Sequence, residues 1–373
     1  MREVVIAGYA RSPFTLANKG ALARVRPDDL AAEVVKALVA RSGVKVEDIE
    51  DLLMGCAFPE GEQGFNIARL VVLLADLPLS VGGMTMNRFC GSSMSGVHYA
   101  AGQIQLGAGE VFICAGVESM SRVPMMGFNP MPNPALAKAS QAYIGMGDTA
   151  ENVAKAYGLS RAEQEAFAVL SQGKARDAMA AGKLADEIVP VAGVTADGTP
   201  RPETTAETLA GLKPAFSADG SVTAGTSSPL TDGAAAVLVC SMDYAKANNL
   251  DILAKVKSVA ISGCAPEIMG IGPVASSQKA MQRAGISATD LSVVELNEAF
   301  ASQSLAVIRD LGLDIAKVNL DGGAIAVGHP LGATGARIVG KAASLLKREG
   351  GKYALATQCI GGGQGIATVL EAI

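Results

Sequence analysis

Apolar runs of strand length alternate with segments whose apolar residues recur at helical spacing over the first part of the chain. The pattern predicts strands at residues 4–8, 49–56, 81–87 and 111–115 and helices at residues 27–42, 64–75 and 92–106. Pro27 would occupy the first position of its helix, where a missing N–H leaves no hydrogen bond unmade. Such alternation is typical of an α/β domain and predicts that neighbouring strands pair in parallel.

The character of the chain changes between about residues 119 and 223, where loops rich in Met, Pro and Asn precede two helical patterns. These patterns predict helices at residues 149–157 and 161–181, and Ser160 is a candidate N-cap for the second. Buried strands predicted at residues 232–240 and 253–263 then resume the earlier alternation. We therefore expect an insertion within an α/β framework.

An internal repeat relates the last third of the chain to the first third. Residues 43–54 align with residues 285–296, and residues 111–116 align with residues 354–359. A nearly equal offset places Cys90 opposite His329, each ahead of a stretch of small residues that leads into a helical pattern. If two similar halves pack about a pseudo-twofold axis, Cys90 of one half lies near His329, Asn297 and Cys359 of the other.

Composition narrows the class of partner. The 373 residues are 49% hydrophobic and 4% aromatic, with no Trp and a formal net charge of -5. The absence of a basic run argues against nucleic acid as a partner, and no apolar run is long enough to span a membrane. The N-terminus predicts a strand and not a signal peptide, and the six cysteines are scattered without a C-x-x-C pair. We expect a cytoplasmic protein with reduced thiols and no metal site.

Cys90 is the first candidate for chemistry, because it lies among small residues just before a predicted helix. Unpaired amides in a first helical turn and the helix dipole favour a thiolate, whereas the alternative is a buried small hydrophobic side chain. Of the two histidines, His329 follows a glycine-rich stretch and could accept a cysteine proton, or cap its helix. His98 falls inside the helix after Cys90, where we expect a packing or hydrogen-bonding contact.

Two further stretches carry polar groups suited to holding an oxyanion. Asn297 follows a predicted strand, where it could cap a helix, anchor a water or substrate oxygen, or do both. Cys359 begins a run of glycines that includes Gly361, and the amides of such a run can converge on an anionic oxygen. The run lacks the spacing of a nucleotide-phosphate loop.

Four blocks of the chain resemble the signature blocks of the thiolase superfamily, in the same order: residues 87–96, 297–301, 322–337 and 359–365. The similarity extends over essentially the whole chain. It implies an α/β fold of duplicated βαβαβαββ halves, layered αβαβα, with an inserted loop domain. The implied boundaries are 1–118 plus 223–247 for the first half, 119–222 for the inserted domain that covers the CoA and acyl pocket, and 248–373 for the second half.

The same resemblance implies a set of catalytic roles. Cys90 would attack the keto carbon of a 3-ketoacyl-CoA and carry the acyl group until CoA collects it. His329 would activate Cys90 and, with a water held by Asn297, form an oxyanion hole. Cys359 would protonate the acetyl-CoA enolate and later deprotonate CoA, and the amides of Cys90 and Gly361 would form a second oxyanion hole. CoA is then a co-substrate, with no tightly bound cofactor.

The resemblance also suggests where CoA and the acyl chain bind. It places Arg201, Thr208 and Ser228 at CoA-binding positions and Met146 in the acyl pocket. Gly145 stands where short-chain biosynthetic thiolases commonly carry a histidine, which favours the degradative 3-ketoacyl-CoA thiolases of β-oxidation. Such enzymes are usually homodimers or dimers of dimers that act on acyl-CoA and CoA, and some join a hydratase-dehydrogenase subunit.

Three other functions stay open on the sequence. The nearest is a biosynthetic acetyl-CoA acetyltransferase that uses the same residues to condense two acetyl-CoA molecules. A thiolase-like lipid-binding subunit would keep the fold without turnover, although the intact Cys90, His329 and Cys359 argue against it. A Cys-His thioester hydrolase would need no free CoA as acyl acceptor.

Overall fold

Ten strands form one mixed β-sheet in this computed structural model, which describes residues 2–373. The strands are β1 (Val4–Arg11), β2 (Thr15–Leu16), β3 (Asp51–Gly55), β4 (Gly82–Met86), β5 (Val111–Ser119), β6 (Thr231–Ser241), β7 (Ala254–Gly263), β8 (Leu291–Leu296), β9 (Tyr353–Ile360) and β10 (Gln364–Glu371). Their order across the sheet is β4-β3-β5-β6-β1-β7-β10-β9-β8, and the short β2 pairs with β6.

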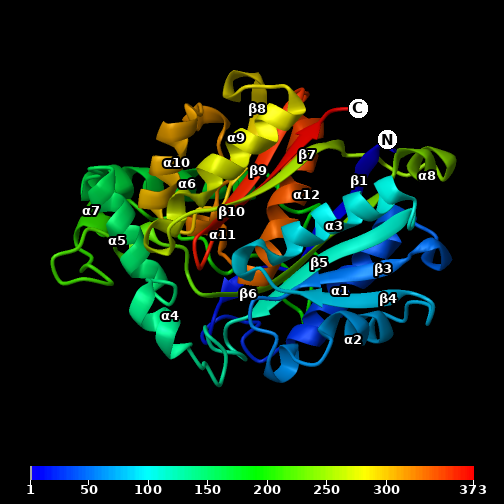
Figure 1. Cartoon of the computed structure of the whole chain (residues 1–373), viewed down its shortest axis with the longest axis horizontal. Helices are drawn as coiled ribbons and strands as arrows, with labels where there is room; N and C mark the ends of the chain where they lie inside the picture. The colour runs from blue at the N-terminus through cyan, green and yellow to red at the C-terminus, as the bar shows by residue number, and fades with distance from the viewer. Residues whose placement is uncertain (1) are drawn as a thin grey trace.

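The α-helices cover the outer faces of the sheet and also fill the space between its two halves (Figure 1). They are α1 (Pro27–Ser42), α2 (Ile67–Leu74), α3 (Ser92–Leu106), α4 (Pro134–Ala139), α5 (Met146–Ala156), α6 (Arg161–Ala180), α7 (Ala206–Ala210), α8 (Met242–Ala247), α9 (Gly272–Ala284), α10 (Ala301–Leu311), α11 (Ala324–Val327) and α12 (Leu331–Glu349). None of the helices in residues 2–373 has the length and apolar character needed to cross a membrane.

The strand directions correct one prediction. Pairing is parallel between β3 and its neighbours β4 and β5, and between β8 and β9, but β6 runs antiparallel to both β1 and β5. In the second half, β10 runs antiparallel to β9 and also to β7, and only three residues, 361–363, connect β9 to β10. A connection this short can join only antiparallel neighbours.

Two helices fill the space between the half-sheets. α12 contacts β1, β5 and β6 of the first half and β8 and β9 of the second, so its residues are buried on nearly every side. α3 lies beside α12, whereas α1 and α2 cover the outer face of the first half-sheet and α9 and α10 cover that of the second. The arrangement is the αβαβα layering expected from the sequence.

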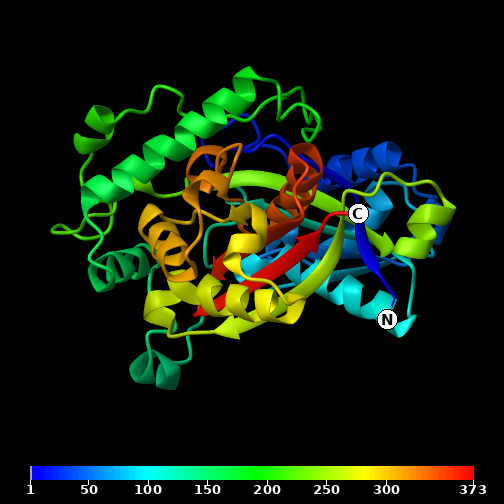
Figure 2. The ribbon, with the colours of Figure 1, turned by 90° about the horizontal axis from the view of Figure 1, so that it is seen from above.

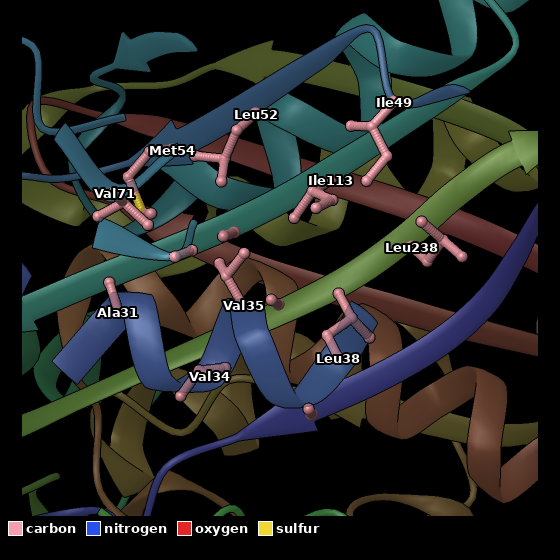
Figure 3. Close-up of a cluster of buried hydrophobic side chains, with 14 of the residues drawn as sticks. Ala31, Val34, Val35, Leu38, Ile49, Leu52, Met54, Val71, Ile113 and Leu238 are labelled. Atoms are coloured by element: carbon pink, nitrogen blue, oxygen red, sulfur yellow. The ribbon is translucent and has the colours of Figure 1, made fainter. Parts of the chain in front are cut away.

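α1 illustrates how local sequence sets an element that then packs by its apolar face. Pro27 occupies its first turn, and Gly43 ends it in the left-handed conformation that glycine adopts without strain. Figure 3 shows Val35 and Leu38 of this helix facing Leu238 of the sheet. Burying each such aliphatic side chain contributes roughly 1.5–3 kcal/mol, which exceeds the contribution of either cap.

The internal repeat is present in the structure. Short 3-10 turns at Val46–Asp48 and Ala288–Asp290 precede β3 and β8. The buried helices α3 and α12 begin two residues after Cys90 and His329, respectively. The catalytic candidates therefore stand at corresponding turns of the two halves.

The inserted segment predicted at residues 119–222 contains α4, α5, α6 and α7, drawn in green and gathered at the end of the molecule opposite both chain termini (Figures 1 and 2). Ser160 caps α6 as expected, because its side chain accepts a hydrogen bond from the Glu163 backbone N–H while the Glu163 carboxylate accepts one from the Ser160 backbone N–H. The predicted helix ends agree closely with those of α6.

Candidate active site

Three of the four candidate catalytic side chains line a single cavity. Cys90, His329 and Cys359 share a cavity of about 440 Å³ with Met146 and Ser228. Cys90 and His329 come from the turns that follow β4 and α11, and Cys359 comes from β9, so both halves of the chain contribute. The structure thus brings together residues that lie far apart in the sequence.

The Cys90 turn is held in a constrained conformation. Cys90 lies in a 3-10 turn, Phe89–Gly91, ahead of α3 and not in the α-helix itself. Phe89 adopts φ 42°, a left-handed value that a bulky residue rarely takes without support. The Asn87 side chain accepts from the Phe89 N–H at 2.8 Å, and the Ser92 hydroxyl donates to the Phe89 carbonyl at 2.6 Å. These bonds fix the direction in which the thiol points.

The surroundings of Cys90 favour a thiol over the expected thiolate. Burial in the cavity raises the pKa of the Cys90 thiol to about 12, although backbone N–H groups of Gly361 and of Cys90 itself face the sulfur and act in the opposite direction. Desolvation of the charged form outweighs these donors. The thiol must therefore pass its proton to a base when it reacts.

His329 is a neutral imidazole with a hydrogen-bond partner beside each ring nitrogen. Its Nδ1 lies 2.6 Å from the Thr334 hydroxyl, and its Nε2 lies 3.4 Å from Nδ2 of Asn297. Burial, and then the positive charge of Arg337, lower the pKa of His329 to about 3. Its interpretation as a helix cap is wrong, because Pro330 occupies the cap position of α12.

Asn297 is fully buried at the end of β8, and it does not cap a helix. α10 begins only at Ala301, with Phe300 at its cap position, because the intervening residues run extended beside the Ser227–Ser228 segment. Among residues 2–373, Oδ1 of Asn297 has no hydrogen-bond partner. The amide therefore keeps capacity to bind a water or a substrate oxygen.

Cys359 ends the series on β9, where it is 1% exposed. Burial raises the pKa of its thiol well above the ordinary value, and the neighbouring Cys90 acts in the same direction. Two glycines just after Gly361, Gly362 and Gly363, have φ 82° and 85°, which explains why the turn into β10 needs glycine. Because burial raises the pKa of both thiols, Cys90 and Cys359 rest protonated. Cys359 can therefore donate a proton while Cys90 carries an acyl group.

A second, mostly apolar cavity of about 350 Å³ also opens on Cys90. The two cavities share five residues: Cys90, Met125, Gly145, Met146 and Leu331. The remaining walls of the apolar cavity come mainly from the inserted segment, including Met126, Met131, Tyr143 and Ile144. Cys90 therefore stands where an apolar cavity meets the cavity that holds the other catalytic candidates.

The predicted CoA-binding residues are placed unequally. Ser228 lines the catalytic cavity, whereas Arg201 and Thr208 are exposed and outside its lining. The Thr208 hydroxyl accepts from the Thr205 N–H in a capping box at α7. The Arg201 guanidinium donates to the Ile325 carbonyl at 3.4 Å and forms no ion pair with another residue of 2–373, so its charge stays available to an anion.

Sequence reasoning missed three residues that hold the site together. Thr334 contacts His329, Gln358 donates a hydrogen bond to the Cys90 carbonyl, and the buried carboxylate of Glu118 accepts the Gly332 N–H at 2.9 Å. Glu118 had a sequence signal, since it is the one charged residue in a strand of mostly apolar residues. His98 plays the structural part expected of it, with Nε2 at 2.9 Å from the Thr368 hydroxyl.

Comparison with known proteins finds relatives along the whole chain. The family model described as "Thiolase, N-terminal domain" matches residues 4–243, and "Thiolase, C-terminal domain" matches residues 250–372. A 3-ketoacyl-CoA thiolase of Bacillus subtilis (strain 168) is 49% identical over 389 residues, and one of Vibrio vulnificus (strain YJ016) is 47% identical over 388 residues; each comparison covers 100% of both chains. The crystal structure of human mitochondrial 3-ketoacyl-CoA thiolase in complex with CoA aligns with a TM-score of 0.92 and 38% identity, over 100% of this chain and 98% of that one.

Proposed function

The chain belongs to the thiolase family, and we propose that it uses CoA to cleave a 3-ketoacyl-CoA into acetyl-CoA and a shortened acyl-CoA. The observation that carries this proposal is the shared cavity of Cys90, His329 and Cys359. A nucleophile, a neutral base and a second thiol are the groups that a two-stage acyl transfer requires.

In the first stage, Nε2 of His329 takes the proton of Cys90, and the thiolate attacks the keto carbon. The bond between that carbon and its neighbour on the thioester side then breaks, and its electron pair forms the enolate of acetyl-CoA. The Cys359 thiol supplies the proton that converts this enolate to acetyl-CoA. The shortened acyl group remains on Cys90 as a thioester.

In the second stage, the Cys359 thiolate takes the proton of an incoming CoA thiol, whose sulfur attacks the acyl-cysteine. Cys90 leaves as a thiolate and recovers its proton from His329. The N–H groups of Cys90 and Gly361, which face the sulfur, would hold the oxyanion of an intermediate. A water bound to Asn297 beside His329 would hold a second oxyanion.

The apolar cavity supports the degradative assignment over the biosynthetic one. A condensation of two acetyl groups needs no space beyond Cys90, whereas an extended acyl chain needs an apolar pocket that opens there. Gly145 forms part of the shared wall and carries no side chain to close it. We propose that the physiological substrates carry acyl chains longer than acetoacetyl.

A thiolysis assay across acyl lengths tests the function. CoA-dependent cleavage should extend from acetoacetyl-CoA to longer 3-ketoacyl-CoA substrates, and Cys90→Ala should abolish both turnover and the mass shift of the acylated protein. Cleavage confined to acetoacetyl-CoA would favour the acetyltransferase. Product release without free CoA would favour the hydrolase, and binding without turnover would favour the lipid-binding subunit.

We further propose that the chain works as a homodimer or dimer of dimers in the cytoplasm, in β-oxidation. The edge strand β4 has one unpaired side, and Phe65 and Leu79 nearby are 96% and 77% exposed. All six cysteines are free thiols, in keeping with a reducing compartment. Light scattering on the wild type and on Phe65→Asp tests the oligomer, and co-purification tests a hydratase-dehydrogenase partner.

A further inference from the structure

Thr334 lies in the first turn of α12, and its hydroxyl makes the shortest contact of the His329 ring. We infer that Thr334 is a positioning residue that holds His329 in the tautomer with its proton on Nδ1. Nε2 is then left unprotonated and able to accept the Cys90 proton. This inference rests on the proposed thiolysis for its catalytic consequence, although the tautomer itself can be measured without turnover.

The geometry on the Nδ1 side selects this tautomer. Nδ1 lies 2.6 Å from Oγ1 of Thr334, and the same oxygen lies 3.0 Å from the carbonyl oxygen of Pro330, to which it donates. A hydroxyl has one proton to give, so an oxygen that donates to Pro330 meets the ring as an acceptor. Nδ1 must therefore carry the hydrogen.

The geometry on the Nε2 side selects the same form. The side-chain atom in hydrogen-bond contact with Nε2 is Nδ2 of Asn297, an N–H donor at 3.4 Å. A nitrogen that faces a donor serves as an acceptor, so Nε2 carries no hydrogen. Since Nδ1 is hydrogen-bonded to Thr334, Nε2 is the ring nitrogen available to the Cys90 thiol in the shared cavity.

Burial makes the choice of tautomer consequential. His329 is 5% exposed and Thr334 is fully buried, so solvent offers the ring few alternative partners. Burial and the charge of Arg337 lower the pKa of His329 to about 3, and a neutral ring carries its single proton on one nitrogen only. If that nitrogen were Nε2, the ring would face Cys90 with a donor and could not take its proton.

The position of the hydroxyl is itself rigid. α12 is buried along nearly its whole length between the two half-sheets, so Thr334 cannot shift without moving the helix. When Cys90 reacts, its S–H bond breaks and an N–H bond forms at Nε2. The hydrogen on Nδ1 stays hydrogen-bonded to the Thr334 hydroxyl. This hydroxyl accepts from the imidazolium as it did from the neutral ring.

Three variants separate the hydroxyl from the shape of the side chain. Thr334→Val keeps the shape but removes the hydroxyl, and we expect kcat for thiolysis to fall about tenfold with little change in KM for CoA. Thr334→Ser restores a hydroxyl and should recover most of the rate. Ser276→Ala is the matched control, because Ser276 is a buried hydroxyl that contacts the Gly272 carbonyl four residues earlier in α9, outside the site.

Histidine nitrogen NMR reads the tautomer directly. The chain has only two histidines, so labelling histidine with ¹⁵N gives two rings, and His98→Gln assigns them. We expect the His329 ring of the wild type to be protonated on Nδ1, and Thr334→Val to populate the Nε2–H form. This measurement stands even if the Val variant loses stability, because the wild-type spectrum alone tests the assignment.

Two results would overturn the inference. One is a wild-type His329 ring protonated on Nε2, which would mean that Asn297 presents its oxygen and that Thr334 donates to the ring. The other is a folded Thr334→Val enzyme whose kcat lies within about twofold of the wild type, or a Ser variant that fails to recover. Absence of thiolysis in the wild type, with the Nδ1–H form intact, would instead count against the proposed function alone.

Discussion

The side-chain amide of Gln358 donates a hydrogen bond to the backbone carbonyl of Cys90. This bond joins β9 of the second half to the nucleophile turn of the first half, directly beside Cys359. It restrains a turn in which Phe89 already adopts an uncommon left-handed conformation. The orientation of the nucleophile therefore depends on a contact between the two halves.

Replacing Gln358 with Leu should loosen this turn. The buried Cys90 carbonyl would lose its side-chain donor, so we expect a stability loss of about 1 kcal/mol and about a tenfold slower acylation of Cys90. Stopped-flow acylation and thermal unfolding measure the two effects. Gln164→Leu is the control, because its buried amide donates to Ser221 at 2.9 Å away from the cavity and should lower stability without slowing acylation.

Cys359→Ala should separate the two stages of the reaction. In the proposed mechanism Cys359 protonates the departing CoA sulfur, but CoA can also leave as a thiolate, so the mass shift of the acylated protein should persist at a lower rate. Carbon-carbon bond formation needs a base for the acetyl group, so the condensation rate should fall by at least about a hundredfold. Cys264→Ala, a partly buried thiol outside the cavity lining, should behave like the wild type. A wild-type condensation rate in Cys359→Ala would remove this residue from the mechanism.

The alkylation of Cys90 should depend on pH in a defined direction. Because burial raises the pKa of the thiol to about 12, it stays protonated through neutral pH, and the thiolate population grows about tenfold per pH unit as pH rises. The iodoacetamide rate should therefore climb from pH 7 to pH 10 without a plateau. A Cys90→Ser variant identifies the label at this site. A plateau between pH 5 and pH 8 would indicate a resting thiolate-imidazolium pair and contradict this account.

Gly145→His should narrow the range of acyl chains. Gly145 lies in the wall shared by both cavities and has φ -64° and ψ 142°, which any residue can adopt. A bulky ring there should lower kcat/KM for long 3-ketoacyl-CoA by about tenfold relative to acetoacetyl-CoA. Gly102→Ala, where an added methyl group meets no atom within 4 Å, serves as the control. Equal selectivity in Gly145→His and the wild type would show that this wall does not limit chain length.

Much of the framework was predictable because its signals are local. The ends of α1 and α3 agree with the predicted helices at 27–42 and 92–106, since Pro27, Gly43 and Gly107 mark them in the sequence. The repeat also predicted correctly that Cys90 and His329 stand at equivalent turns and that Cys359 joins them in one cavity. The boundaries of the inserted domain stay a prediction.

The predictions that the structure corrected depend on contacts between distant segments. Strand direction around β6 depends on where the chain returns after the inserted segment, and the protonation of Cys90 depends on burial by residues from both halves. The sequence by itself determined the helix ends, the repeat and the residue types of the site, because these follow from spacing and composition. Only the tertiary structure decided that Cys90 rests as a thiol, that Asn297 faces His329 and that Thr334 and Gln358 support the site. Desolvation and hydrogen-bond partners arise from contacts between distant segments, which no local pattern records.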